Sequence, residues 1–145
     1  MNKLIGNTPL IKIRYKYNNI EKVIYVKLEQ YNLTGSIKDR IALYMLEKAQ
    51  KEKILKKGMP IIEATSGNTG IALAALGAKM GNPVYIFLPD WVSTERSKLM
   101  KLYGAKVIPV SKVEGGFKAC IRKANILAHQ INGYRPDQFS NYLNT

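Results

Sequence analysis

Residues 60–70 read Pro60-Ile61-Ile62-Glu63-Ala64-Thr65-Ser66-Gly67-Asn68-Thr69-Gly70, and this stretch decides the fold. It predicts a short apolar strand, then a loop of hydroxyls, an amide and glycines, and then a helix. The helix is expected to continue through residues 71–79, which are good helix formers and are apolar on nearly every side. Such a loop directs backbone N–H groups and the positive end of the helix dipole at one point, which favours an anion site.

The side chains of this loop suit the same interpretation. Gly67 and Gly70 allow the backbone to approach a ligand closely. Further hydrogen-bond donors come from the polar side chains of Thr65, Ser66, Asn68 and Thr69. A plainer alternative is a tight turn in which Asn68 or Thr69 only caps the helix. The loop by itself leaves both interpretations open.

Strands and helices alternate regularly from this loop to the end of the chain. The strand 61–64 precedes the helix from Asn68, Val84–Leu88 precedes a helix near 93–103, and Lys106–Val110 precedes a helix near 117–131. The spacings allow right-handed crossovers between parallel strands. We therefore expect an α/β fold with a mainly parallel open sheet and helices on both faces, a three-layer α/β/α arrangement.

The N-terminal part has a different pattern. Thr8–Ile13 and Val23–Leu28 are predicted to be strands, with Tyr17-Asn18-Asn19 as the turn signal between them. A helix is then expected from about Ile37 to Lys53, ended by the glycine and proline at positions 58 and 60. One face of this helix is expected to carry Ile37, Ile41, Tyr44, Met45 and Ala49.

Lys38 is the candidate for amine chemistry. In open parallel sheets, ligands collect beyond the carboxyl ends of the strands. The loops expected there are Thr65–Gly70, Pro89–Val92, Ser111–Gly116 and, from the start of the first helix, Asn32–Ser36. A lysine in the first turn of a helix lies at the positive end of the dipole, which favours its neutral amine, the form that reacts with carbonyl groups. The alternative is a solvated lysine that pairs with Asp39 or Glu63.

Bulk composition sets the limits. A chain of 145 residues with 46% hydrophobic residues has the size and content of one folded domain. We expect a soluble, cytoplasmic protein, because no apolar run approaches the roughly 20 residues that span a bilayer and because the one cysteine, Cys120, has no internal disulfide partner. His129 has no metal-ligand neighbours, so no metal site is expected.

The net charge of +13 raises the hypothesis of nucleic-acid binding. Its lysines are spread along the whole chain, and the one cluster, Lys51–Lys57, lies where a helix is expected to end and where cations suit the dipole. No base-reading motif accompanies the cluster. We therefore expect no nucleic-acid partner and no membrane partner.

Several motifs together resemble one enzyme family. They are Ile5-Gly6-Asn7-Thr8-Pro9-Leu10, Thr34-Gly35-Ser36-Ile37-Lys38-Asp39-Arg40, Thr65-Ser66-Gly67-Asn68-Thr69-Gly70, Glu114-Gly115-Gly116-Phe117 and Gln138-Phe139-Ser140-Asn141. In this order they resemble the cysteine synthase and cystathionine β-synthase family of fold-type II pyridoxal-phosphate enzymes. The resemblance covers essentially the whole chain, and several motifs in register are more specific than any one of them.

The resemblance implies a role for each candidate residue. Lys38 would bind pyridoxal 5'-phosphate covalently and act as the acid and base at Cα of the substrate. Asn68 would hydrogen-bond the ring hydroxyl of the cofactor. The carboxylate of the amino-acid substrate would be bound by Thr65, Ser66, Gly67, Thr69 and Gln138. The implied reaction is β-replacement, in which O-acetylserine or a similar activated serine reacts with sulfide to give cysteine.

The resemblance also has a limit, because family members are about twice this length. Their second half carries the Gly/Thr-rich loop that binds the cofactor phosphate, and no such loop is recognisable here. We expect an N-terminal fragment: residues 1–35 would pack on the missing domain, be mispaired or disordered, or serve association, and residues 36–145 would form a small α/β domain. Full-length relatives are expected to be homodimers. The alternatives are a non-catalytic binding module from a split or decayed gene, or cystathionine β-synthase-type activity with homocysteine.

Overall fold

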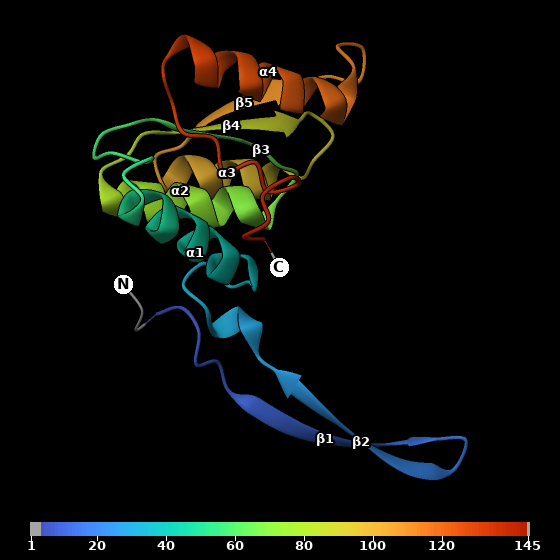
Figure 1. Cartoon of the computed structure of the whole chain (residues 1–145). Coiled ribbons are helices and arrows are strands. Elements are labelled where there is room, and N and C mark those ends of the chain that lie inside the picture. The colour runs from blue at the N-terminus through green and yellow to red at the C-terminus, as the bar shows by residue number, and fades with distance from the viewer. Residues whose placement is uncertain (1–3, 145) are drawn as a thin grey trace.

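The computed structural model describes residues 4–144 and shows an α/β body with a β-hairpin that extends from it (Figure 1). The elements in chain order are β1 (Leu10–Tyr17), β2 (Ile20–Lys27), a short 3₁₀ turn (Glu29–Tyr31), α1 (Lys38–Lys51), β3 (Ile61–Ala64), α2 (Asn68–Met80), β4 (Val84–Pro89), α3 (Thr94–Leu102), β5 (Lys106–Val110) and α4 (Gly116–Gln130). The three strand–helix units after residue 60 confirm the predicted alternation.

The body is a parallel sheet in the order β3-β4-β5 between two helical layers. Helices α1, α2 and α3 lie on one side of the sheet and α4 lies on the other (Figure 1). All four residues of β3 are buried, as a parallel strand covered on both faces requires. The predicted α/β class, with helices on both faces, is confirmed.

At both edges of this sheet, backbone groups that could pair with another strand are occupied or missing. Tyr134, after α4, forms a parallel bridge with Ile61 at the β3 edge, where the backbone N–H of Ile62 donates to its carbonyl at 2.9 Å. At the other edge, β5 contains Pro109, which has no N–H to donate. The sheet therefore presents little regular backbone for pairing at either side.

Helix α2 approaches the sheet closely because it contains Gly77. A Cβ at this position would lie 2.2 Å from Cγ2 of Val84 and 3.0 Å from the carbonyl oxygen of Asn82. Nine residues of α2 are buried, which agrees with its apolar character on nearly every side. The helix that carries the candidate loop is thus fixed directly on the strands.

Helix α1 differs from the prediction at its face and at its end. Its buried apolar residues are Ala42, Leu43, Met45, Leu46 and Ala49, whereas Ile37 and Tyr44 are 55% and 54% exposed. The helix ends at Lys51, two residues before its predicted end near Lys53. Lys53 adopts a left-handed φ of 61°, and the N–H of Ile54 then bonds the carbonyl of Ala49 at 2.9 Å.

The two N-terminal strands pair with each other in a regular antiparallel register from Leu10↔Lys27 to Tyr17↔Ile20. Asn18 and Asn19 form the turn with φ values of 48° and 60°, the left-handed conformation that two-residue hairpin turns need. The strands are longer than predicted. Nearly all of their residues are exposed, although one face gathers the apolar side chains of Ile11, Ile13, Tyr17, Ile20, Ile24 and Val26.

The base of the hairpin is anchored to α1 through Glu29. The carboxylate accepts hydrogen bonds from Arg40 at 2.7 and 2.9 Å, from the hydroxyl of Thr8 at 2.7 Å and from the amide of Asn32 at 2.8 Å. These bonds, the Arg40 bond foremost, lower the pKa of Glu29 to about 2. The base of the hairpin is therefore fixed to α1, whereas strands β1 and β2 are exposed.

Candidate functional site

A cleft of about 360 Å³ lies where α1 and α2 begin and β3 ends. Its lining residues are Ile37, Lys38, Thr65, Ser66, Gly67, Asn68, Thr69, Arg96, Gln138, Phe139 and Asn144. All seven residues that the sequence singles out for the site are among them. The rule that ligands collect beyond the carboxyl ends of parallel strands therefore locates this cleft.

Lys38 is the first residue of α1 and lies half-buried in the wall of the cleft. Its backbone N–H donates to the hydroxyl of Ser36 at 3.2 Å. The two carboxylates considered as its partners are engaged elsewhere. Asp39 accepts the N–H of Thr34 at 2.7 Å as well as the Thr34 hydroxyl, and Glu63 accepts backbone N–H groups. Among residues 4–144 no ion pair involves Lys38.

The loop after β3 enters α2 without a side-chain cap. Gly67 occupies the N-cap position, and its N–H donates to the hydroxyl oxygen of Thr65 at 3.2 Å. Neither Asn68 nor Thr69 caps the helix, so the plainer interpretation of the loop does not describe this structure. Ser66 and the first residues of α2, Asn68 and Thr69, line the same cleft as Lys38. The first-turn N–H groups of a helix have no partner within the helix and favour an anion.

Gln138 closes the cleft from the far end of the chain. Its Oε1 accepts the hydroxyl of Thr69 at 2.7 Å, and its Nε2 donates to the carbonyl of Ala64 at 3.0 Å. With 7% of its surface exposed, the side chain is bonded mainly to the body of the protein. One amide hydrogen remains for a ligand, because the –NH₂ group has two donors.

Glu63, Arg135 and Asp137 form an ionic group that holds the backbone of Gln138. Glu63 is fully buried, and its carboxylate accepts the N–H of Ala64 at 2.8 Å and the N–H of Gln138 at 3.0 Å. Arg135 lies 3.8 Å from Glu63 and 2.9 Å from Asp137. Burial raises the pKa of Glu63 to about 7, against the lowering effect of these donors. This group could not be recognised from the sequence, because Glu63 lies more than 70 positions from Arg135 and Gln138.

Arg96 is a charged lining residue that the sequence did not single out. It lies in the first turn of α3, and its Nη1 donates to the carbonyl of Ser66 at 3.3 Å. A Cβ on Gly67 would lie 3.3 Å from its Cζ. The available signal was a charged residue three positions after the predicted helix start near residue 93, in the unit that follows the strand next to β3.

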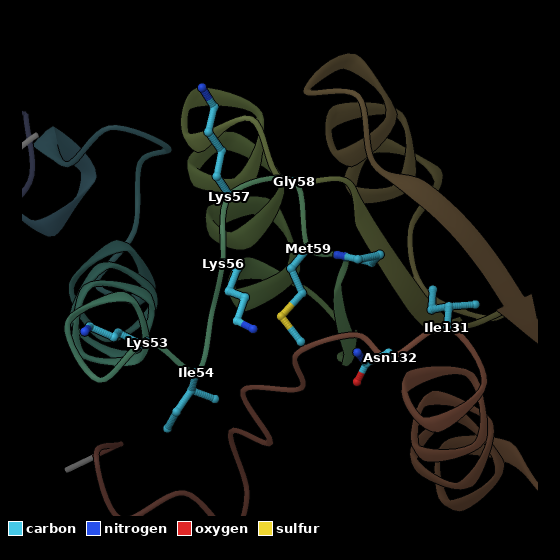
Figure 2. A pocket seen from close by; sticks show the side chains of 9 residues that line it. Lys53, Ile54, Lys56, Lys57, Gly58, Met59, Ile131 and Asn132 are labelled. Carbon is cyan, nitrogen blue, oxygen red and sulfur yellow. The ribbon is translucent and has the colours of Figure 1, made fainter.

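A larger cleft, of about 590 Å³, lies at the other end of the sheet and is lined by the loop after α1 (Figure 2). Its three lysines, Lys53, Lys56 and Lys57, point in different directions in Figure 2. Its remaining lining is largely apolar or backbone, as at Met59 and Ile131. The polar groups do not converge, so we assign the chemistry to the smaller cleft.

The remaining candidates lie away from this cleft. Cys120 is fully buried against the α4 face of the sheet, and burial raises the pKa of its thiol. His129 is exposed in the last turn of α4. Within residues 4–144 no three His, Cys, Asp or Glu side chains gather as metal ligands, and none of the helices has the length and apolar character that crossing a membrane requires.

The fold is that of a pyridoxal-phosphate-dependent class of enzymes. The family model described as "Pyridoxal-phosphate dependent enzyme" matches residues 1–145, and the chain belongs to this family. It is 46% identical over 141 residues to a cysteine synthase of a Flavobacterium species. The aligned region covers 97% of this chain and 45% of that protein.

Solved structures agree. A hydrogen sulfide-producing enzyme from Fusobacterium nucleatum is 52% identical with a TM-score of 0.93, over 97% of this chain and 42% of that one. A cysteine synthase from Entamoeba histolytica is 38% identical with a TM-score of 0.88, over 97% of this chain and 43% of that one. The chain thus spans less than half the length of these relatives, and it matches them along nearly all of its own.

Proposed function

We propose that this chain supplies the substrate-binding and lysine-bearing part of a cysteine synthase, which forms cysteine from O-acetylserine or a similar activated serine and sulfide. The observation that carries this proposal is the cleft in which the amine of Lys38 shares a wall with the loop Thr65–Thr69. The identity to enzymes named cysteine synthase supports the choice of reaction within the family.

The residues of the cleft fit pyridoxal phosphate by the chemistry of their side chains. Lys38 offers an amine for an aldehyde, and Asn68 offers an amide for a ring hydroxyl. The lining contains no carboxylate that would repel an anionic ligand. When bound, the cofactor supplies an electron sink for the bonds at Cα of the amino acid.

The residues of the cleft have separate roles in this proposal. The amine of Lys38 holds the cofactor and afterwards moves the proton at Cα of the substrate. The N–H groups at the start of α2, that of Thr69 among them, and the hydroxyl of Ser66 bind the α-carboxylate and so orient Cα. Gln138 holds Thr69 and offers its second amide hydrogen to the same carboxylate.

The hairpin has its own place in this proposal. We propose that residues 1–35 contact a second domain, with the apolar face of β1 and β2 turned toward it, while residues 36–145 form the domain that binds the substrate. The exposure of that face supports this division. Residues 1–3 and 145 lie outside the described residues.

Borohydride labelling tests the role of Lys38. The 145-residue chain is mixed with pyridoxal phosphate, reduced and digested, and the modified fraction is measured lysine by lysine by mass spectrometry. We expect Lys38 to be modified at lower cofactor concentration than exposed lysines such as Lys101, and the Lys38→Ala chain to lose the corresponding absorbance change. Equal modification of Lys38 and Lys101 would contradict the proposal.

The reaction itself is tested by assay. O-acetylserine and O-phosphoserine are offered with sulfide or homocysteine, to the chain alone and with the C-terminal half of a cysteine synthase supplied in trans. Cysteine formed only when Lys38 is present supports the proposal. Selective use of homocysteine would move the assignment to cystathionine β-synthase chemistry, and consumption of neither serine would refute both.

A further inference from the structure

Arg96 lies where two consecutive loops of the sheet meet. Strands β3 and β4 are parallel neighbours, so the start of α3, which follows β4, comes close to the loop that follows β3. The Nη1 of Arg96 bonds the carbonyl of Ser66, and the side chain lies so near Gly67 that an added Cβ would be 3.3 Å from both Cζ and Nε. Any larger residue at position 67 would displace the guanidinium of Arg96 by a few tenths of an ångström.

The charge of Arg96 is not neutralised by the chain. Among residues 4–144, no carboxylate forms an ion pair with it. Its neighbour Glu95 is turned back on the helix start, where hydrogen bonds with its own backbone N–H and with Ser93 lower its pKa. The cleft lining therefore contains two cations, Lys38 and Arg96, and no acid.

The donors of the carboxylate loop are partly in use. The Thr69 hydroxyl gives its proton to Gln138, and the Thr65 oxygen receives the N–H of Gly67. Of the donors in this loop, the Thr69 hydroxyl and the backbone N–H of Gly67 are thus already used within the protein. Arg96 has five N–H groups and uses one of them on Ser66. Charge-assisted donors of this kind are about twice as strong as neutral ones.

We infer that Arg96 is a further substrate-binding residue, which binds the α-carboxylate of the amino acid together with the Ser66–Thr69 loop. The inference rests on the proposed function and deepens it: the site selects amino acids with a free carboxylate over their amides. A merely structural role, in which Arg96 only supports the Ser66 carbonyl, would not discriminate between these ligands.

Titration followed by NMR tests this role without any catalysis. The ¹⁵N-labelled chain is titrated with L-serine and, separately, with L-serinamide, while the backbone N–H signals of Gly67 and Asn68 are followed. We expect L-serine to bind and L-serinamide to bind at least tenfold more weakly. Arg96→Gln should weaken L-serine binding about tenfold, which corresponds to about 1.4 kcal/mol, and Arg96→Lys should restore part of it.

Lys98→Gln is the matched control, because it removes the same charge from α3 outside the cleft lining. It should bind L-serine as the unmodified chain does. Equal L-serine affinity of Arg96→Gln and Lys98→Gln would overturn the inference, as would the absence of any difference between L-serine and L-serinamide in the unmodified chain. Labelling of Lys38 in these same variants reports on the proposed function separately, since it needs no amino acid.

Discussion

The hydroxyl of Thr69 donates a 2.7 Å hydrogen bond to Oε1 of Gln138, which joins the first turn of α2 to the segment after α4. The same glutamine bonds the end of β3 through the carbonyl of Ala64. Its own carbonyl accepts the amide of Asn144 at 2.6 Å. One residue thus connects the strand, the helix and the C-terminal segment that surround the cleft.

Loss of this connection should reduce stability by a measurable amount. Gln138→Ala leaves the Thr69 hydroxyl and the Ala64 carbonyl without their partner, so we expect a loss of about 1–3 kcal/mol in the free energy of unfolding. Thr69→Val should cost about 1 kcal/mol. Urea denaturation of both single variants and the double variant measures the coupling. Strictly additive losses would show that the two residues do not depend on each other.

Glu63 should make the stability of the chain fall with rising pH. Its pKa is raised from 4.5 to about 7 in the folded chain, so between these values the folded state binds more protons than the unfolded state. The free energy of unfolding must then decrease from about pH 4.5 to 7, by at most about 3 kcal/mol.

Urea midpoints between pH 5 and 8 measure this slope, with Glu63→Gln as the comparison. The variant is expected to be less stable overall, because its amide must face a backbone N–H, but its slope should be shallower. Identical slopes in the two proteins would rule out Glu63 as the titrating group.

The approach of α2 to the sheet predicts a costly Gly77→Ala substitution. Alanine favours a helix by about 1 kcal/mol over glycine, but here its methyl group would collide with Val84 at 2.2 Å. We expect a net loss of about 1–3 kcal/mol. Adding Val84→Ala removes the colliding atom, so the double variant should be more stable than the sum of the single losses allows. A stabilised Gly77→Ala chain would contradict this packing.

The contact between Arg40 and Glu29 at the base of the hairpin can be removed without disturbing the α/β body. Arg40→Met removes the two bonds to Glu29, whose partners are partly exposed, so the global free energy of unfolding should change by less than about 1 kcal/mol. Hydrogen exchange in residues 10–27 should nevertheless accelerate, because Arg40 holds the hairpin base. Lys48→Met, which breaks an exposed pair within α1, is the control and should leave that exchange unchanged.

The sequence predicted those features that depend on neighbouring residues. The three strand–helix units follow from apolar runs and loop residues, and the rule for parallel sheets brings Lys38 and Asn68 to one cleft. The end of α1 was predicted to within two residues, and the left-handed conformation of Lys53, which is rare for lysine, accounts for the difference. The buried pair Glu63 and Arg135, and the approach of Arg96 to Gly67, join residues distant in sequence, which a single sequence does not reveal by its local pattern.

The two edges of the parallel sheet have a consequence for how the protein behaves at high concentration. Tyr134 occupies the backbone groups beside β3, and Pro109 interrupts the donors of β5. Edge-to-edge growth, the usual route by which sheets aggregate, is therefore obstructed on the body. Within residues 4–144, the hairpin alone offers two long regular edges, so aggregation through backbone pairing should begin at β1 and β2.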